Sequence, residues 1–120
     1  MLLAFTQINM KNLILVILTI FGFVGVANAQ KEPVTLKFKV YGNCEMCKAT
    51  IEKALDVKGV KAANWNTETK MIEVVYVPAK ISEEKIHELI ADSGYDTEKA
   101  KASDKVYGDL HSCCKYPRGK

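Results

Sequence analysis

The chain has 120 residues, of which 17 are Lys or Arg and 14 are Asp or Glu, so its formal net charge is +3 at pH 7. Lysines alternate with acidic residues instead of forming a block, which argues against nucleic acid or an anionic membrane as the partner. All four cysteines lie beyond residue 43.

The N-terminal segment has the composition of a secretory signal peptide. It contains no Asp or Glu, and an apolar run over 13–26 is followed by Ala27-Asn28-Ala29, a small-x-small cleavage pattern. The run is too short for a comfortable membrane span. We therefore predict cleavage before Gln30 and a periplasmic or secreted protein, with an uncleaved anchor as the alternative.

Cleavage would leave 91 residues with a net charge of +2, because Lys11 is the only charged residue lost. This length suffices for one domain with one modest core. Met10 is an alternative start to Met1, since it places Lys11 directly before the apolar run. We expect three parts: a signal peptide over 1–29, a domain over 30–102 and a C-terminal tail over 103–120.

The domain is predicted to begin with a strand and a helix. Residues 34–41 alternate apolar and polar side chains, as in a half-buried strand. From Glu45 to about Lys58 the period becomes helical, and the buried face would carry Cys47, Ile51, Ala54 and Leu55. Gly59 stands where a left-handed residue would stop the helix.

Two more strands and a second helix are predicted to follow. The strands cover 60–66 and 70–77, and the second of them points Ile72, Val74 and Tyr76 inward. Ser82 is a good N-cap for a helix with Ile86, Leu89 and Ile90 on its buried stripe, and Gly94 is its expected C-cap.

Residues 95–102 complete the predicted pattern as a short fourth strand. The order strand, helix, strand, strand, helix, strand predicts an α+β, ferredoxin-like βαββαβ fold. In this fold two helices cover one face of a four-stranded antiparallel sheet and leave the other face to solvent. The tail over 103–120 shows no clear period and carries its own cysteine pair.

Cys44-Glu45-Met46-Cys47 spans the predicted turn from the first strand into the first helix. Both sulfurs can converge there, and the unpaired N–H groups of a helix N-terminus favour thiolate over thiol. Two close thiolates suit a soft ion of low coordination number such as Cu(I) or Hg(II), whereas structural zinc usually takes four ligands. An open two-ligand site on a surface loop would allow the ion to be passed on.

The stretch from Val34 to about Ala100 resembles a heavy-metal-associated domain. The resemblance rests on the first strand, Gly42-x-Cys44-x-x-Cys47, helix positions Ile51 and Leu55, Gly59-Val60 and Ser93-Gly94-Tyr95. It implies a ferredoxin-like fold and exchange of metal between paired CxxC sites, without catalysis. It also implies that Cys44 and Cys47 are the metal ligands and that Tyr95 lies near the metal loop.

The metal loop departs from the family pattern. The family commonly has Gly-Met-Thr-Cys, whereas this chain has Gly42-Asn43-Cys44. The loop is therefore one residue shorter and lacks the Met that usually anchors it in the core.

The expected cargo is Cu(I), with Hg(II), Zn(II) and Cd(II) as alternatives. The expected role is transfer or sequestration of this ion in metal homeostasis or detoxification. The expected partner is a metal-transporting membrane protein or another metal-binding domain. We expect a monomer, with a metal-bridged dimer as the alternative.

Rival interpretations of the CxxC are a thiol-disulfide redox centre and a structural disulfide. Against a thioredoxin-like protein, no Trp precedes the motif and the elements after Gly59 come in the wrong order. The same fold order occurs in RNA-recognition domains, but residues 70–77 lack their glycine-aromatic pattern.

Several remaining residues are open or expected to be ordinary. His87 is predicted to be solvated or at an edge, and Trp65 and Met71 are predicted to be packing residues. In the tail, His111, Cys113 and Cys114 gather soft ligands within four residues. A disulfide between adjacent cysteines would be strained, so the pair could instead bind metal, pair elsewhere or stay loose.

Overall fold

The computed structural model describes residues 32–118, so the predicted signal peptide over 1–29 lies outside the described residues. Among the residues it describes, no helix has the length and apolar character needed to cross a membrane. The elements in chain order are β1 (Val34–Lys39), α2 (Glu45–Ala54), β2 (Val60–Trp65), β3 (Met71–Tyr76), α3 (Glu83–Asp92), α4 (Asp104–Gly108) and a short 3-10 turn, η2 (Ser112–Cys114).

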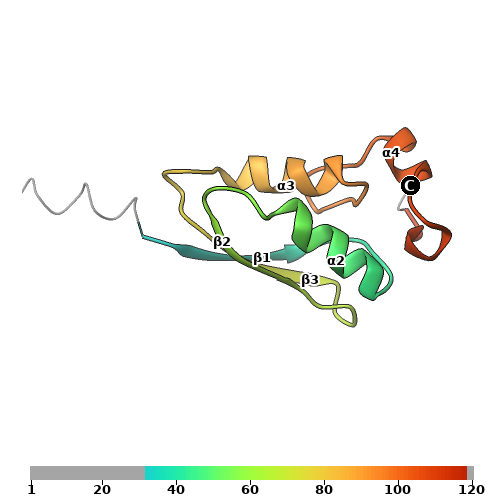
Figure 1. The fold of residues 1–120 in the computed structure, drawn as a ribbon, viewed down its shortest axis with the longest axis horizontal. Coiled ribbons are helices and arrows are strands. Elements are labelled where there is room, and N and C mark those ends of the chain that lie inside the picture. Colours follow the sequence, from blue (N-terminus) through green and yellow to red (C-terminus); the bar gives the residue numbers. More distant parts are fainter. Residues whose placement is uncertain (1–31, 119–120) are drawn as a thin grey trace, which may run out of the picture. The chain divides into compact units, whose positions relative to one another are not determined.

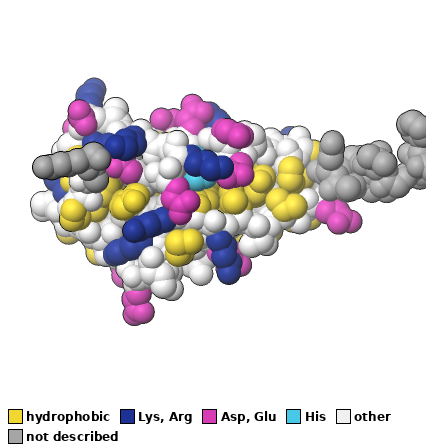
Figure 2. Space-filling view, turned by 180° about the vertical axis from the view of Figure 1, so that it is seen from behind, with side chains coloured by type: hydrophobic (Ala, Val, Ile, Leu, Met, Phe, Trp, Pro, Cys, Tyr) yellow, Lys and Arg dark blue, Asp and Glu magenta, His cyan; other side chains and the backbone are white. Residues whose placement is uncertain are grey.

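The three strands form one antiparallel sheet in the order β1-β3-β2. Helices α2 and α3 lie on the same face of this sheet (Figure 1). This arrangement confirms the α+β, ferredoxin-like class of fold. On the face that Figure 2 displays, Lys and Arg side chains are interspersed with Asp and Glu, which agrees with the near balance of charge in the sequence.

The predicted fourth strand over 95–102 is wrong. The segment makes one isolated antiparallel bridge, between Val40 and Thr97. The chain then turns, because the Thr97 N–H donates to the Ala100 carbonyl at 2.7 Å and the Thr97 hydroxyl oxygen accepts from the Ala100 N–H at 3.0 Å. These local hydrogen bonds compete with the pairing that would extend the ladder. The sheet of the described chain therefore has three strands.

This turn still covers the end of β1. The Tyr41 N–H donates to the Asp96 carbonyl at 2.9 Å, and the Lys39 N–H donates to the Glu98 carboxylate at 2.9 Å. A loop thus supplies the hydrogen bonds that a fourth strand would have supplied here.

Both helices begin as the sequence predicts. Glu45 opens α2, and the Ser82 hydroxyl caps α3 by accepting the Lys85 N–H at 3.1 Å. Helix α2 ends at Ala54, four residues before the predicted end, and Gly59, with φ of +100°, serves the turn into β2 instead.

The core between sheet and helices contains the predicted inward residues. Buried members include Phe38, Val40, Cys47, Ile51, Leu55, Trp65, Ile72, Val74, Ile86, Ile90 and Tyr95. Leu89 is only partly buried. The packing prediction is confirmed for Trp65 and wrong for Met71, whose position on β3 leaves it 38% exposed.

The expectation for His87 is also wrong. Its side chain is 2% exposed, its ring lies 3.9 Å from the Phe38 ring between centroids, and its Nδ1 lies 2.5 Å from the Thr97 hydroxyl. Burial lowers the pKa of His87, so the neutral ring is favoured. It is a core residue that holds the turn after α3.

The tail is ordered rather than irregular. Ser103 is the N-cap of helix α4, and its hydroxyl accepts the Val106 N–H at 3.2 Å. Beyond η2, Tyr116 is 2% exposed and lies in the core cluster. The tail over 103–118 therefore packs as part of the domain.

Candidate metal centre

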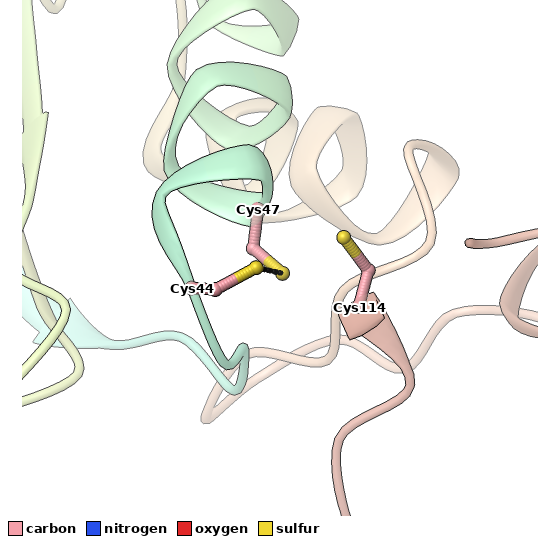
Figure 3. Close-up of side chains that lie close together, drawn as sticks. All are labelled: Cys44, Cys47 and Cys114. Carbon is pink, nitrogen blue, oxygen red and sulfur yellow. Dashed lines mark hydrogen bonds between the residues drawn. The ribbon is translucent and has the colours of Figure 1, made fainter. Parts of the chain in front are cut away.

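Cys44 and Cys47 come together because a helix starts between them. Cys44 is the N-cap residue of α2 and has an extended backbone, while Cys47 lies in the first turn and is fully buried. Their Sγ atoms are 3.7 Å apart, and both cysteines are free (Figure 3). The predicted pair is thus a preformed dithiol.

The start of α2 also makes Cys44 acidic. The backbone N–H groups of Cys47 and Met46 point at its sulfur and lower its pKa from 9.0 to about 7. These N–H groups have no partner within the helix, so they stabilise the thiolate. A thiolate is the form that binds a metal ion.

Trp65 packs against the loop that contains Gly42 and leads to Cys44. A Cβ added to Gly42 would lie 3.0 Å from the Trp65 ring, so a larger residue there would push against the indole. The indole N–H donates to the carbonyls of Val40 and Lys70 at 3.1 and 3.2 Å. Trp65 therefore anchors a loop that lacks the usual methionine. The sequence predicts that Trp65 is a packing residue, but no pattern in the sequence connects it to the loop.

Lys48, one residue after the motif, binds groups on α2 and β2. Its ammonium donates to Glu52 at 2.5 Å, to Asn64 at 2.6 Å and to the Trp65 carbonyl at 2.8 Å. It therefore links α2 to β2.

The tail brings a third sulfur to the pair. The Sγ atoms of Cys44, Cys47 and Cys114 all lie within 4.8 Å of one another, and Cys114 is 2% exposed. Figure 3 shows its side chain beside the CxxC pair. Cys113 is exposed, and His111, also exposed, is outside this cluster. The sequence could not choose among these tail residues.

Tyr95 closes the inner side of the cluster. Its hydroxyl lies close to the thiols of Cys114 and Cys47, and burial together with these neighbours raises the pKa of Tyr95 well above its usual range. It therefore stays a neutral phenol. This position agrees with the expectation that Tyr95 lies near the metal loop.

The donor set decides which ions fit. In the described part of the chain, the cluster capable of holding a metal consists of three cysteines, without histidine or carboxylate. Sulfur donors select soft ions such as Cu(I) over Mg²⁺ or Ca²⁺.

Comparison with known proteins agrees with this geometry. Residues 38–96 match the heavy-metal-associated domain. The copper chaperone CopZ of Staphylococcus aureus is 34% identical over 55 residues, which cover 45% of this chain and 81% of that protein.

Two solved structures are also similar. Oxidized MerP from Ralstonia metallidurans CH34 is 32% identical with a TM-score of 0.52, covering 55% of this chain and 94% of that one. The water-soluble region of the P-type ATPase CopA from Bacillus subtilis is 36% identical with a TM-score of 0.53, covering 56% of this chain and 46% of that one. The fold, the sulfur loop and these matches show that the chain belongs to the heavy-metal-associated domain family.

Proposed function

We propose that this protein binds a soft heavy-metal ion, with Cu(I) as its preferred cargo, through Cys44 and Cys47. The observation that carries the proposal is the free dithiol at the N-terminus of α2, with sulfurs 3.7 Å apart. One of these thiols is substantially ionised near neutral pH, since the pKa of Cys44 is about 7. The ion is cargo to be transferred or sequestered, and the protein is not an enzyme.

The choice of copper is supported by the names of relatives. CopZ is described as a copper chaperone, and a further similar structure is described as the copper-binding domain of a P-type ATPase. Hg(II), Zn(II) and Cd(II) are alternative cargoes, because thiolate donors also bind these ions.

A metal-transporting membrane protein or another metal-binding domain is the partner we propose. The likeness to the soluble region of CopA supports it, because domains that share a fold and a loop can present paired CxxC sites to one another. The test is Cu(I) transfer from the loaded protein to such a domain, followed by separation of the two. If copper stays entirely with the donor while a CopZ-type chaperone transfers under the same conditions, the proposed partner class is wrong.

We also propose export to the periplasm or beyond, on the composition of residues 1–29. Intact-mass measurement of the exported protein should give a chain that begins at Gln30. A mass that retains residues 13–26 would mean an anchored protein instead.

The metal proposal is tested with the double variant Cys44→Ser, Cys47→Ser. It should lose Cu(I) affinity by more than about 100-fold in competition with a chelator, because both ligands are gone while the remaining core is unchanged. Cys113→Ser is the matched control and should keep wild-type affinity. Circular dichroism on the reduced apo-proteins checks that the variants fold.

The result that would overturn metal binding is a double variant that competes as well as wild type. The redox alternative makes a different prediction from the same acidic thiol. Reduction of insulin disulfides by wild type, lost in the double variant, would support that alternative.

A further inference from the structure

The position of Cys114 is set by contacts that do not involve the other sulfurs. Two residues further on, the buried Tyr116 hydroxyl donates to the Gly94 carbonyl at 2.9 Å and accepts the Asp96 N–H at 2.8 Å. Arg118 then binds the Asp96 carboxylate through two N–H groups, at 2.9 and 3.0 Å, and donates to the Ala102 carbonyl at 2.6 Å. We call Tyr116 and Arg118 the latch.

Aromatic packing reinforces the latch. The Tyr116 ring stacks near Tyr95 and Tyr41, with centroids 5.9 and 6.5 Å apart, and meets the edge of Tyr107 at 5.0 Å. Such pairs add to the burial of the rings themselves. The tail is therefore held in place without a metal.

The tail also touches the metal loop directly. The Cys113 carbonyl accepts from the Asn43 side-chain amide at 3.3 Å, and the Cys44 thiol lies 3.8 Å from the same oxygen. Asn43 occupies part of the loop in which this chain departs from its family, so the altered loop is also the one that meets the tail.

The spacing of the CxxC sulfurs favours a third ligand. With metal–sulfur bonds of about 2.3 Å, a linear two-coordinate ion needs sulfurs about 4.6 Å apart, whereas a planar three-coordinate ion needs about 4.0 Å. Cys44 and Cys47 are 3.7 Å apart, which is too close for a linear two-coordinate ion and fits a site with at least three sulfur ligands. The Cys114 sulfur lies within 4.8 Å of both, so a small inward movement gives it an equal bond.

We infer that Cys114 is the third thiolate ligand of the metal site, delivered by the latched tail, so that the ion is held by three sulfurs in a closed site. This inference rests on the proposed function. When the ion enters, the Cys114 S–H bond breaks, its proton passes to solvent and the sulfur lone pair forms the bond to the metal. No change of oxidation state is needed.

Cys113 has a different role in this arrangement. Its sulfur is exposed, 3.7 Å from the Met46 sulfur and 3.9 Å from that of Cys114. It lies at the exposed side of the site and is not one of the three ligands.

An ion bound by three sulfurs leaves more slowly than one held by two, because release requires an additional bond to break.

X-ray absorption on the Cu(I)-loaded protein tests the inference by counting sulfur neighbours. Wild type should have three, Cys114→Ser should have two, and the control Cys113→Ser, Met46→Leu should keep three. A chelator should also extract the ion at least about tenfold faster from Cys114→Ser than from the control, as expected for a barrier lower by about 1.4 kcal/mol.

Two sulfurs in wild type, or three persisting in Cys114→Ser, would overturn the inference while leaving metal binding by the CxxC intact. A wild-type protein that takes up no Cu(I) would overturn both proposals. If Cys114→Ser fails to fold, the other two proteins still decide. The chain has four cysteines, so three sulfur neighbours in both wild type and the control identify Cys114 as the third ligand. A drop to two in the control would mean that Cys113 or Met46 supplies the third sulfur.

Discussion

Removal of one oxygen atom from Tyr116 tests how firmly the tail is held. The variant is Tyr116→Phe, which keeps the ring and deletes the hydroxyl. That hydroxyl bonds the Gly94 carbonyl and the Asp96 N–H, and burial raises the pKa of Tyr116 to about 12, so it remains a donor throughout the neutral range. Both backbone groups lie in buried residues, where water cannot easily replace the lost partner.

The expected loss follows from these two unpaired groups. A buried backbone group without a partner costs about 1–3 kcal/mol, so the variant should lose roughly 2–4 kcal/mol of unfolding free energy. For a domain of this size, 1 kcal/mol corresponds to about 4–8 °C in Tm. We expect Tm to fall by roughly 8–32 °C. Local detachment of the tail could limit the global loss, but it would then expose Cys114.

The assay is thermal unfolding of the reduced apo-protein, together with the rate of Cys114 labelling at 25 °C. The control is Tyr41→Phe, because the Tyr41 ring stacks on Tyr116 but its hydroxyl has no hydrogen bond within residues 32–118. The unfolding free energy of this control should change by about 0.5 kcal/mol or less. If Tyr116→Phe matches this control in both Tm and labelling, the hydroxyl does not hold the tail and the latch is wrong.

Two further predictions concern the sulfur loop. Cys44 should react with iodoacetamide at a rate that rises through pH 7, because its pKa is lowered to about 7. Cys114 should stay unreactive below pH 9 in the native apo-protein, because burial raises its pKa to about 12. Peptide mass spectrometry that finds equal labelling of the two cysteines at pH 7.5 would contradict this. Gly42→Ala should lose about 1–3 kcal/mol in urea unfolding, because its Cβ would lie 3.0 Å from the Trp65 ring, while Gly108→Ala, with open space around it, should lose nothing. Equal stability of the two alanine variants would mean that the indole moves aside freely.

The parts of the fold that could be predicted from sequence depend on local patterns. Alternation along β3 placed Ile72, Val74 and Tyr76 inward, and all three are buried. The Ser82 cap forms as expected because its partner is only three residues away. The CxxC pair was equally visible, since the start of a helix alone brings Cys44 and Cys47 together.

The features that could not be predicted depend on contacts between distant residues. His87 is buried because Thr97, ten residues away, meets its ring nitrogen, and no periodicity signals such a pair. Tyr116 is ordered by backbone groups 20 and 22 residues before it. Cys113 and Cys114 are adjacent in sequence, and only the turn η2 directs one sulfur outward and the other inward.

The three-stranded sheet has a consequence for how much chain is free to reach the metal loop. A strand that ran the length of β1 would carry the backbone away from the sulfur loop, toward the far end of the sheet. Here the pairing stops after the single bridge at Thr97, with Glu98 bonding the Lys39 N–H in place of further strand. The chain reverses at once, and the stretch up to Cys114 can return to the end of the domain where it began. Because the chain leaves the sheet early, the segment after Thr97 can bring the Cys114 thiol to the metal loop.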